Sequence, residues 1–382
     1  MKRWTLSTGC RHRHFKPTTT LPPAPPLLLT VLSHPEQAGT LTPADWDLLL
    51  RQAGSANLMA ALHALLQARG LLAAIPAAAR EQLDWAGVLG ERHRQAVRWE
   101  VRRIRLALRD LGIPIILLKG AAYTLAGLPP AQGRLFSDID ILVAESDLDQ
   151  VEAALMLAGW ASTHHDAYDQ RYYREWMHEL PPMQHMRRES LIDVHHAILP
   201  RTAALQPDPR LLRAAAVALP DEAGLLTFAP ADMVLHSATH LFHDGELNNG
   251  LRDLADIHGL LRHFGAQPGF WDELAQRAAQ LHLQRPLFYA LRYCQRLLAT
   301  PVPASASAAC DSGRPGAALL ALMDALFARA LLPDHASCQD AFTPAARLLL
   351  YIRANWLRMP PLLLARHLFH KAFLSPREAA PA

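Results

Sequence analysis

The sequence predicts an α+β protein in which a small mixed β-sheet is embedded in a largely α-helical chain. Leucine and alanine recur at helical spacing in both outer parts of the chain, and short isoleucine-rich runs appear only near its middle. Prolines and glycines separate these segments. The chain has 382 residues, of which 51% are hydrophobic and 19% charged, so it can bury a sizeable core in two or three domains.

Residues 1–40 are predicted to form a flexible N-terminal extension. Basic residues are followed there by an apolar run at 27–32, a combination that superficially suggests an export signal. Four prolines at 22–26 precede the run, and it is far shorter than the ~20 residues of a membrane-spanning helix. We therefore expect no membrane span here, and no other segment is apolar for long enough.

Residues 41–112 are predicted to form an N-terminal helical region. Trp46, Leu58 and Leu62 belong to apolar positions three and four residues apart. A longer helix is expected over 88–111, where an apolar stripe opposes an arginine-rich face, and Gly112 and Pro114 end it.

Residues 113–200 have a different pattern and predict a compact α/β core. An unbroken apolar run at 113–118 reads as a buried strand, and a short helix follows at 121–126. Further along we expect a strand at 139–143, a helix at 147–158, an extended segment from Gly159, and a hairpin formed by 183–186 and 190–197.

Residues 201–382 are predicted to form a C-terminal helical domain. Leucine and alanine dominate again, with breaks at several prolines, and the small residues of 305–316 predict a mobile linker.

Charge and cysteine content exclude some classes of protein. The formal charge of +3, from 38 basic and 35 acidic side chains, does not indicate nucleic acid as a partner, although a local basic groove stays open. The four cysteines have no Cys-x-x-Cys spacing, which argues against a structural zinc site or a disulfide framework. A cytoplasmic location fits best.

The pair Asp138 and Asp140 is the first candidate site. Side chains two apart on a strand project from the same face, so both carboxylates can reach one site while Ile139 points into the core. Carboxylates suit Mg²⁺, which binds one or two of them together with phosphate oxygens. The alternative is a solvated strand end.

Lys119 and Gly120 lie between a predicted strand and a predicted helix. The glycine permits close backbone approach, and the lysine and the helix N-terminus favour a phosphate. Arg134 precedes Asp138 by four residues, so it could neutralise a triphosphate or equally pair with Asp138 or Asp140.

A third carboxylate is expected on a neighbouring strand. In the run 191–195, alternation places Asp193 and His195 on one face and Ile192 and Val194 on the other. Aspartate is disfavoured in strands, which invites a functional explanation. His195 could contact substrate or simply hydrogen-bond to Asp193.

Taken in order, these motifs resemble the uncharacterised bacterial nucleotidyltransferase family of the DNA polymerase beta superfamily. The resemblance rests on Lys119-Gly120, Arg134, the strand from Ser137 to Val143 with its two aspartates, and the strand around Asp193 and His195. It implies an Mg²⁺-dependent enzyme that transfers a nucleoside monophosphate from an NTP, with ATP as the first candidate, to an unidentified acceptor. Asp138, Asp140 and Asp193 would be catalytic and hold the metal, and five residues would contact the nucleotide: Lys119, Gly120, Arg134, Ser137 and His195.

This sequence departs from the superfamily pattern in two places. Alanine follows Gly120 where many members have serine, so no hydroxyl is available there to hold a phosphate. Gly120 and Asp138 are also 18 positions apart (138 − 120), a longer connection than compact members use.

A second polar cluster is predicted on a helix near residue 240. His236, His240 and His243 follow i, i+4, i+7 spacing and share a helix face, which could bind a metal. The simpler interpretation is a polar face that lines the cleft between domains.

Two classes of non-enzyme remain as alternatives. A nucleotide-binding module without turnover would need Lys119 and Arg134 but not three carboxylates. A helical scaffold or antitoxin-like partner is suggested by the leucine-rich C-terminal half, and a large exposed apolar patch would favour it.

Overall fold

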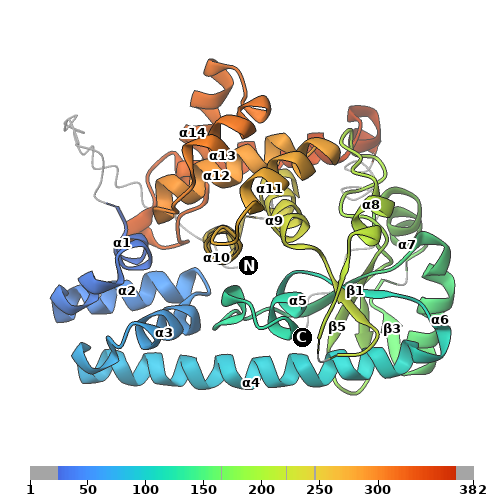
Figure 1. The fold of residues 1–382 in the computed structure, drawn as a ribbon, viewed down its shortest axis with the longest axis horizontal. Helices are drawn as coiled ribbons and strands as arrows, with labels where there is room; N and C mark the ends of the chain where they lie inside the picture. The colour runs from blue at the N-terminus through green and yellow to red at the C-terminus, as the bar shows by residue number, and fades with distance from the viewer. Residues whose placement is uncertain (1–24, 165, 221, 245–246, 367–382) are drawn as a thin grey trace, which may run out of the picture.

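The computed structural model describes residues 25–164, 166–220, 222–244 and 247–366. It confirms the α+β prediction, because helices make up most of the molecule and one mixed sheet lies at its right-hand side in Figure 1. None of the helices in these ranges has the length and apolar character required to cross a bilayer.

Seven short strands form the sheet in the order β3-β4-β5-β2-β1-β7-β6. Parallel pairing joins β2 to β5 and β1 to β7, and the other neighbours are antiparallel. The predicted hairpin is confirmed, because β4 and β5 pair antiparallel. The strands are β1 (Ile115–Leu117), β2 (Asp138–Leu142), β3 (Trp160–Ser162), β4 (Met183–His185), β5 (Leu191–His195), β6 (Val217–Ala218) and β7 (Leu225–Thr227).

The sheet extends beyond the predicted α/β core of 113–200. β7 pairs with β1 along its length, with Leu225 opposite Ile115, and β6 forms the edge. The expectation of a purely helical segment after residue 200 is therefore wrong for these two strands. They contain two and three residues, too few to show the alternation by which a strand is recognised in sequence.

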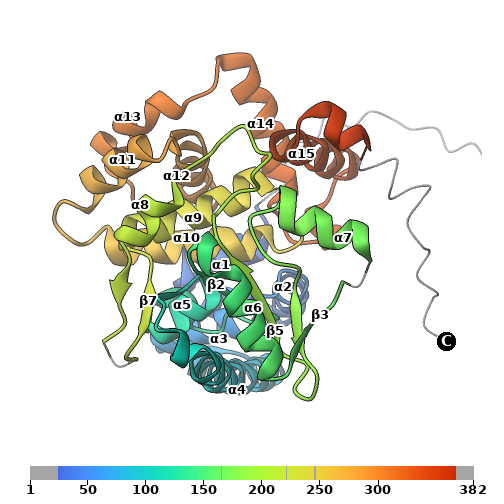
Figure 2. The same ribbon diagram turned by 90° about the vertical axis from the view of Figure 1, so that its right-hand side faces the viewer.

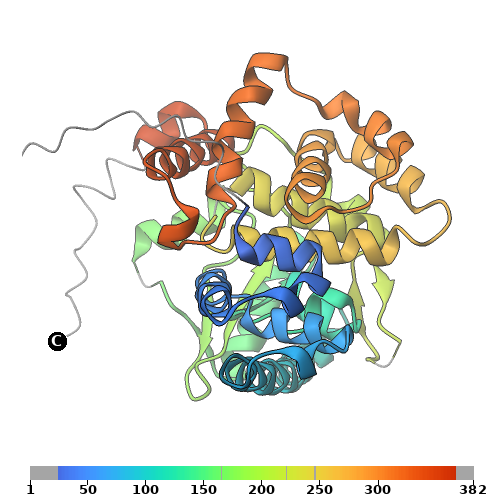
Figure 3. The ribbon, with the colours of Figure 1, turned by 90° about the vertical axis from the view of Figure 1, so that its left-hand side faces the viewer.

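From residue 25 onward, four α-helices precede the sheet: α1 (Leu27–Ser33), α2 (Pro43–Ser55), α3 (Met59–Ala68) and α4 (Ala77–Leu108). The flexible extension expected up to residue 40 is wrong for α1, in which Leu28, Leu29 and Val31 are buried in the core. The prolines precede the helix, where they do not break it, and residues 1–24 lie outside the described ranges. Figure 3 shows the N-terminal helices (blue) between α4 and the C-terminal helices.

Helix α4 runs along the bottom of the molecule in Figure 1 and connects its two sides. It has 32 residues and begins well before the expected position 88, because three alanines at 77–79 favour helix directly after Pro76. It contacts α3 on one side and, on the other, α5 (Lys119–Leu125) and α6 (Leu148–Leu157). The N-terminal helices are thereby fixed relative to the sheet.

Two further short helices accompany the sheet, α7 (Ala167–Arg171) and α8 (Pro209–Ala214). A single π-helical turn at Tyr172–Trp176 follows α7 and leads toward the hairpin. Figure 2 shows α6 and α7 on the side of the molecule that carries the sheet.

Helices form most of the described C-terminal part of the chain. The linker expected over 305–316 is wrong, because a helix and a 3₁₀ turn occupy most of it and bury Ala306 and Cys310. Small residues there allow close packing. The helices are α9 (Pro230–Thr239), α10 (Gly250–Phe264), α11 (Phe270–Gln280), α12 (Gln284–Leu298), α13 (Ala304–Ala309), α14 (Ala317–Ala330) and α15 (Thr343–Arg358).

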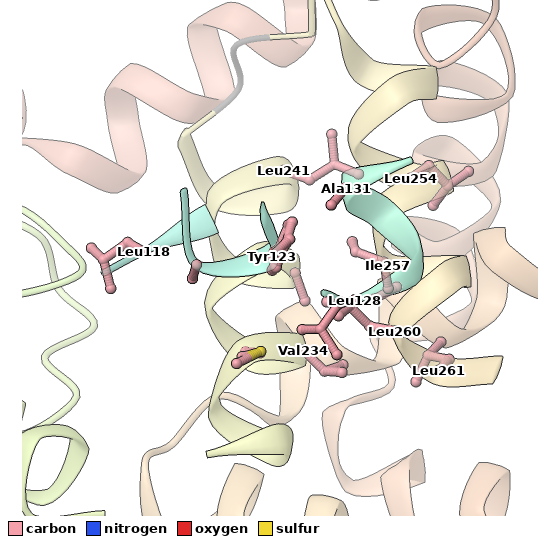
Figure 4. Close-up of a cluster of buried hydrophobic side chains, with 14 of the residues drawn as sticks. Leu118, Tyr123, Leu128, Ala131, Val234, Leu241, Leu254, Ile257, Leu260 and Leu261 are labelled. Carbon is pink, nitrogen blue, oxygen red and sulfur yellow. The ribbon is translucent and has the colours of Figure 1, made fainter. Parts of the chain in front are cut away.

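A continuous hydrophobic core joins the sheet to these helices. Tyr123 on α5 and Leu128 in the turn that follows it pack against Val234 on α9 and Ile257 on α10 (Figure 4). The Tyr123 hydroxyl also lies 2.6 Å from Ser237 Oγ on α9. The segment between β1 and β2 is therefore held by the C-terminal helices.

Candidate active site

Three carboxylates meet on one face of the sheet. β2 and β5 are parallel and in a register that places Asp140 opposite Asp193, with Asp138 two residues before Asp140. One carboxylate oxygen from each of the three residues lies within 4.8 Å of the others. The convergence expected from the alternation of the two strands is therefore confirmed, and these residues are referred to below as the carboxylate triad.

The triad has the chemistry of a divalent cation site. Its donors are hard oxygens from three carboxylates, which suits Mg²⁺ or Mn²⁺. Asp193 Oδ1 is buried and has no hydrogen-bond partner within the described residues. A buried carboxylate oxygen without a donor is unfavourable, and a bound cation would satisfy it.

The electrostatics of the triad favour the same interpretation. Burial raises the pKa of Asp193 to about 8, and the nearby Asp140 and Glu179 carboxylates contribute. Burial and the Asp140 carboxylate also raise the pKa of Asp138. The site therefore holds more negative charge than its protein surroundings compensate, and two of its carboxyl groups take up protons more readily than usual.

Asp140 is the member of the triad that stays ionised. Burial alone would raise the pKa of its carboxyl, but the Lys119 ammonium and the His195 hydrogen bond outweigh burial and hold it well below its usual range. Lys119 Nζ lies 3.6 Å from Asp140 Oδ1. The antiparallel pairing of β1 with β2 positions the lysine, since the Leu118 amide donates to the Asp140 carbonyl oxygen at 3.0 Å.

Gly120 borders the site, and its environment differs from the expectation. A Cβ atom at Gly120 would lie 2.7 Å from the ring of Phe136, which packs directly against the backbone there. Phe136 in turn makes an edge contact with His93 of α4. The close approach that Gly120 permits is therefore that of the Phe136 ring.

A cavity of about 440 Å³ adjoins Asp138 between α4 and the first residues of β2 and β5. Ser137 lines it, and its hydroxyl lies 3.4 Å from Asp138 Oδ1. The opposite wall includes Trp99, which is 45% exposed, and the ion pair between Glu100 and Arg188 at 2.7 Å. Pockets for small molecules have this size and this mixture of apolar wall and few polar groups.

His195 is brought to the triad but bonds to a different aspartate than expected. Its Nε2 lies 3.0 Å from Asp140 Oδ1, and its Nδ1 lies 3.2 Å from Glu179 Oε2. Burial opposes the charged imidazole, but Glu179 and Asp140 raise the pKa of His195 above its usual value. His195 therefore links the triad to Glu179, and the expected bond to Asp193 is not the one that forms.

Sequence reasoning missed Glu179 and its neighbour His178. They lie in an irregular segment after the π-helical turn, where no periodicity marks them. Backbone bonds attach this segment to β5: the His196 amide donates to the His178 carbonyl oxygen at 2.9 Å and the Leu180 amide to that of Val194 at 2.9 Å. The signal that could have found them is the His-Glu pair itself, just before the hairpin whose second strand carries His195.

Arg134 does not pair with either of the aspartates that the sequence suggested. Its side chain is buried and forms ion pairs with Asp256 and Asp253 on α10, whereas Asp138 and Asp140 have other partners. Arg252 supports the same segment by donating to the Leu135 carbonyl oxygen at 3.1 Å. These contacts fasten the loop before β2 to α10.

The three histidines of the C-terminal part lie on α9 and the π-helical turn at His240–Asp244. Burial lowers the pKa of His236 to about 3, and the Lys119 ammonium acts in the same direction. Burial and Lys119 likewise hold the pKa of His240 well below its usual value. His236 and His240 are thus neutral side chains within electrostatic range of the triad, and His243 is buried further along.

Comparison with known proteins agrees with this geometry. The family model described as "uncharacterised nucleotidyltransferase" matches residues 42–299, which include the N-terminal helices from α2, the whole sheet and the helices through α12. No curated protein matches the chain. The match spans more than half of the 382 residues and contains every residue of the triad. The chain therefore belongs to the uncharacterised nucleotidyltransferase family.

Proposed function

We propose that the protein transfers a nucleoside monophosphate from an NTP to an acceptor hydroxyl or amine, with Mg²⁺ held by Asp138, Asp140 and Asp193. The observation that carries this proposal is the convergence of the three carboxylates, one of which has a buried oxygen without a hydrogen-bond partner among the described residues. A module that only senses nucleotides has no need for three converging carboxylates. ATP is the first nucleotide to test.

We assign each residue of the triad a different role because their surroundings differ. When bound, Mg²⁺ would neutralise phosphate charge and lower the pKa of an acceptor hydroxyl. Asp140 is kept ionised by Lys119 and His195, so it is a permanent ligand. A bound cation would favour the ionised form of Asp193, and the raised pKa of this residue makes it the strongest base of the three, so we assign it the acceptor's proton. The acceptor oxygen or nitrogen then bonds to the α-phosphorus as the bond to the β-phosphate breaks, and pyrophosphate leaves.

The remaining site residues bind the triphosphate or hold other site residues in position. Lys119 balances Asp140 and brings positive charge to the place where a triphosphate would meet the triad. Ser137 offers an exposed hydroxyl next to Asp138 for a phosphate oxygen. His195 orients Asp140, and Gly120 allows Phe136 to close one wall. For Arg134 we propose a structural role, because nucleotide binding would require its guanidinium to leave Asp256.

The cavity beside Asp138 has room for the nonreacting part of a substrate. Its volume of about 440 Å³ and its largely apolar wall fit a nucleoside or an acceptor of similar size. Trp99 supplies an aromatic face on which a planar group can stack. Trp99→Ala is therefore expected to raise KM for one substrate several-fold and leave kcat nearly unchanged.

Labelled nucleotides test the proposed function. Each NTP, labelled at the α-phosphate, is incubated with the protein, Mg²⁺ and a lysate of the native cell, and label transfer and pyrophosphate are measured. Asp138→Asn is expected to reduce transfer by at least about 100-fold, because it removes charge that the cation needs. The matched control is Asp149→Asn on the exposed face of α6, which should behave as the parent protein.

Two outcomes would contradict the proposal. Transfer that is unchanged in Asp138→Asn would place the chemistry outside the triad. Nucleotide binding without label transfer, in the presence of Mg²⁺ and the complete lysate, would support the nucleotide-sensing alternative.

An exposed apolar row favours a second candidate, docking of a partner through the C-terminal helices. Leu348, Ile352 and Trp356 are four residues apart on α15, and all are more than half exposed. Rows of this kind mark interaction surfaces. Ile352→Glu should weaken any self-association seen by sedimentation of the full chain, and an unchanged distribution in a protein that does associate would exclude this face as the contact.

A further inference from the structure

A second group of metal-ligating side chains lies next to the carboxylate triad. It consists of His178, Glu179 and His195, and one ligand atom from each lies within 4.8 Å of the others. Among the described residues, this group and the triad are the two sets close enough to share an ion. Unlike the triad, it offers two imidazoles and one carboxylate.

The distances within the group suit a transition metal. An ion bound tetrahedrally at about 2.1 Å from each ligand separates its ligands by roughly 3.4 Å. His195 Nδ1 and Glu179 Oε2 are already 3.2 Å apart. The third ligand atom, from His178, lies within 4.8 Å of the other two, so it is at most roughly 1.4 Å beyond the tetrahedral separation.

His178 gives an independent indication of a ligand. Its Nδ1 is buried and makes no hydrogen bond within the described part of the chain. Its ring lies 5.2 Å from that of His195 at a tilt of 36°. A buried imidazole nitrogen without a partner is unfavourable unless something outside the protein occupies it.

His195 has the environment of a metal-bound histidine. Its Nδ1 faces Glu179 and its Nε2 lies 3.0 Å from Asp140 Oδ1. Histidine ligands in proteins bind the metal with one ring nitrogen and donate the other N–H to a carboxylate, which fixes the ring. Asp140 would fill this supporting role and belong to the triad at the same time.

We propose that His178, Glu179 and His195 form a second metal site, for a borderline-soft divalent cation of the Zn²⁺ class, next to the carboxylate triad and connected to it through His195 and Asp140. Two nitrogens and one oxygen favour Zn²⁺ or Co²⁺ over Mg²⁺. Three protein ligands leave a fourth position for water, as in open rather than closed zinc sites. The inference concerns binding only and does not depend on nucleotidyl transfer.

Cobalt binding tests the proposal on the full chain after removal of bound metal with a chelator. Co²⁺ is titrated in and followed by the visible bands of the tetrahedral ion, and Zn²⁺ binding is measured by equilibrium dialysis. The parent protein should bind one ion with the tetrahedral spectrum. His178→Ala should weaken this binding by at least about 100-fold, since loss of a ligand exceeds the effect of losing a supporting group.

Three further variants make the result specific. Asp138→Asn should keep the tetrahedral Co²⁺ site, because Asp138 belongs only to the triad. His282→Asn, at an exposed histidine after α11, is the control for loss of a histidine elsewhere. His178→Cys should restore Zn²⁺ binding through a thiolate, which separates loss of a ligand from loss of the fold.

The proposal is overturned if the parent shows no tetrahedral Co²⁺ spectrum, or if His178→Ala binds Co²⁺ as tightly as the parent. It is also overturned if Asp138→Asn abolishes the spectrum, because the ion would then lie in the triad. None of these readouts uses NTP turnover, so failure of the proposed function would leave them unchanged.

Discussion

Replacement of Asp193 by asparagine should change how the stability of the metal-free protein depends on pH. The carboxyl has an ordinary pKa of 3.8, and burial with the neighbouring Asp140 and Glu179 raises it to about 8 in the folded protein. Between these values the unfolded chain has lost the proton and the folded chain has kept it. The folded state binds more protons, so its stability falls as the pH rises through this window.

The size of the effect follows from the same pKa difference. From pH 5 to pH 8 each pH unit contributes up to about 1.4 kcal/mol, which sets a limit of about 4 kcal/mol. Asparagine does not ionise and has nearly the shape of the protonated acid. Asp193→Asn should therefore be more stable than the parent by about 1–2 kcal/mol at pH 5 and by about 4–5 kcal/mol at pH 8.

Urea unfolding followed by circular dichroism in the presence of EDTA measures the free energy of unfolding of the parent and of Asp193→Asn at pH 5 and pH 8. Asp149→Asn is the exposed control. Excess Mg²⁺ at pH 8 should reduce the difference between the parent and Asp193→Asn, because a cation that binds the folded triad stabilises the parent more than the variant. An Asp193→Asn protein that has the same stability difference from the parent at pH 5 and pH 8 would refute the reasoning.

Two other substitutions test contacts that surround the site. Arg134→Ala leaves Asp256 buried without its partner, so it should lower the free energy of unfolding in urea by about 3–5 kcal/mol. A change confined to the KM for nucleotide would instead support phosphate binding by this arginine. Gly120→Ala places a Cβ against the Phe136 ring and should lower the free energy of unfolding by about 1–3 kcal/mol. Adding Phe136→Leu should recover part of that loss. Equal unfolding midpoints for Gly120→Ala and the parent would show that the ring moves away freely.

The triad could be predicted from sequence because strand geometry alone determines it. A spacing of two in β2 and alternation in β5 place each aspartate on a known face, and only the pairing of β2 with β5 had to be supplied by the fold. The partners of Arg134 are different. Asp253 and Asp256 lie about 120 positions away on α10, and no local pattern connects them to the loop before β2.

Other features could not be predicted because they also depend on contacts between residues that are far apart in the sequence. Glu179 reaches His195 because an irregular segment adds to the end of β5 through a single bridge, which no periodicity reports. Strand β7 has three residues and is recognisable only beside β1. Helix α1 was misjudged because the prolines before it suggested disorder, whereas burial of Leu28 and Val31 against distant helices stabilises it.

The position of a bound cation tests the central claim most directly. A crystal of the protein soaked with Mn²⁺ and a nonhydrolysable NTP analogue should give an anomalous scattering peak between the carboxylates of Asp138, Asp140 and Asp193, within about 2.0–2.6 Å of at least two of them. The triphosphate should contact the same ion. An Mn²⁺ peak elsewhere with none at the triad, or a nucleotide bound away from these three carboxylates, would contradict the account.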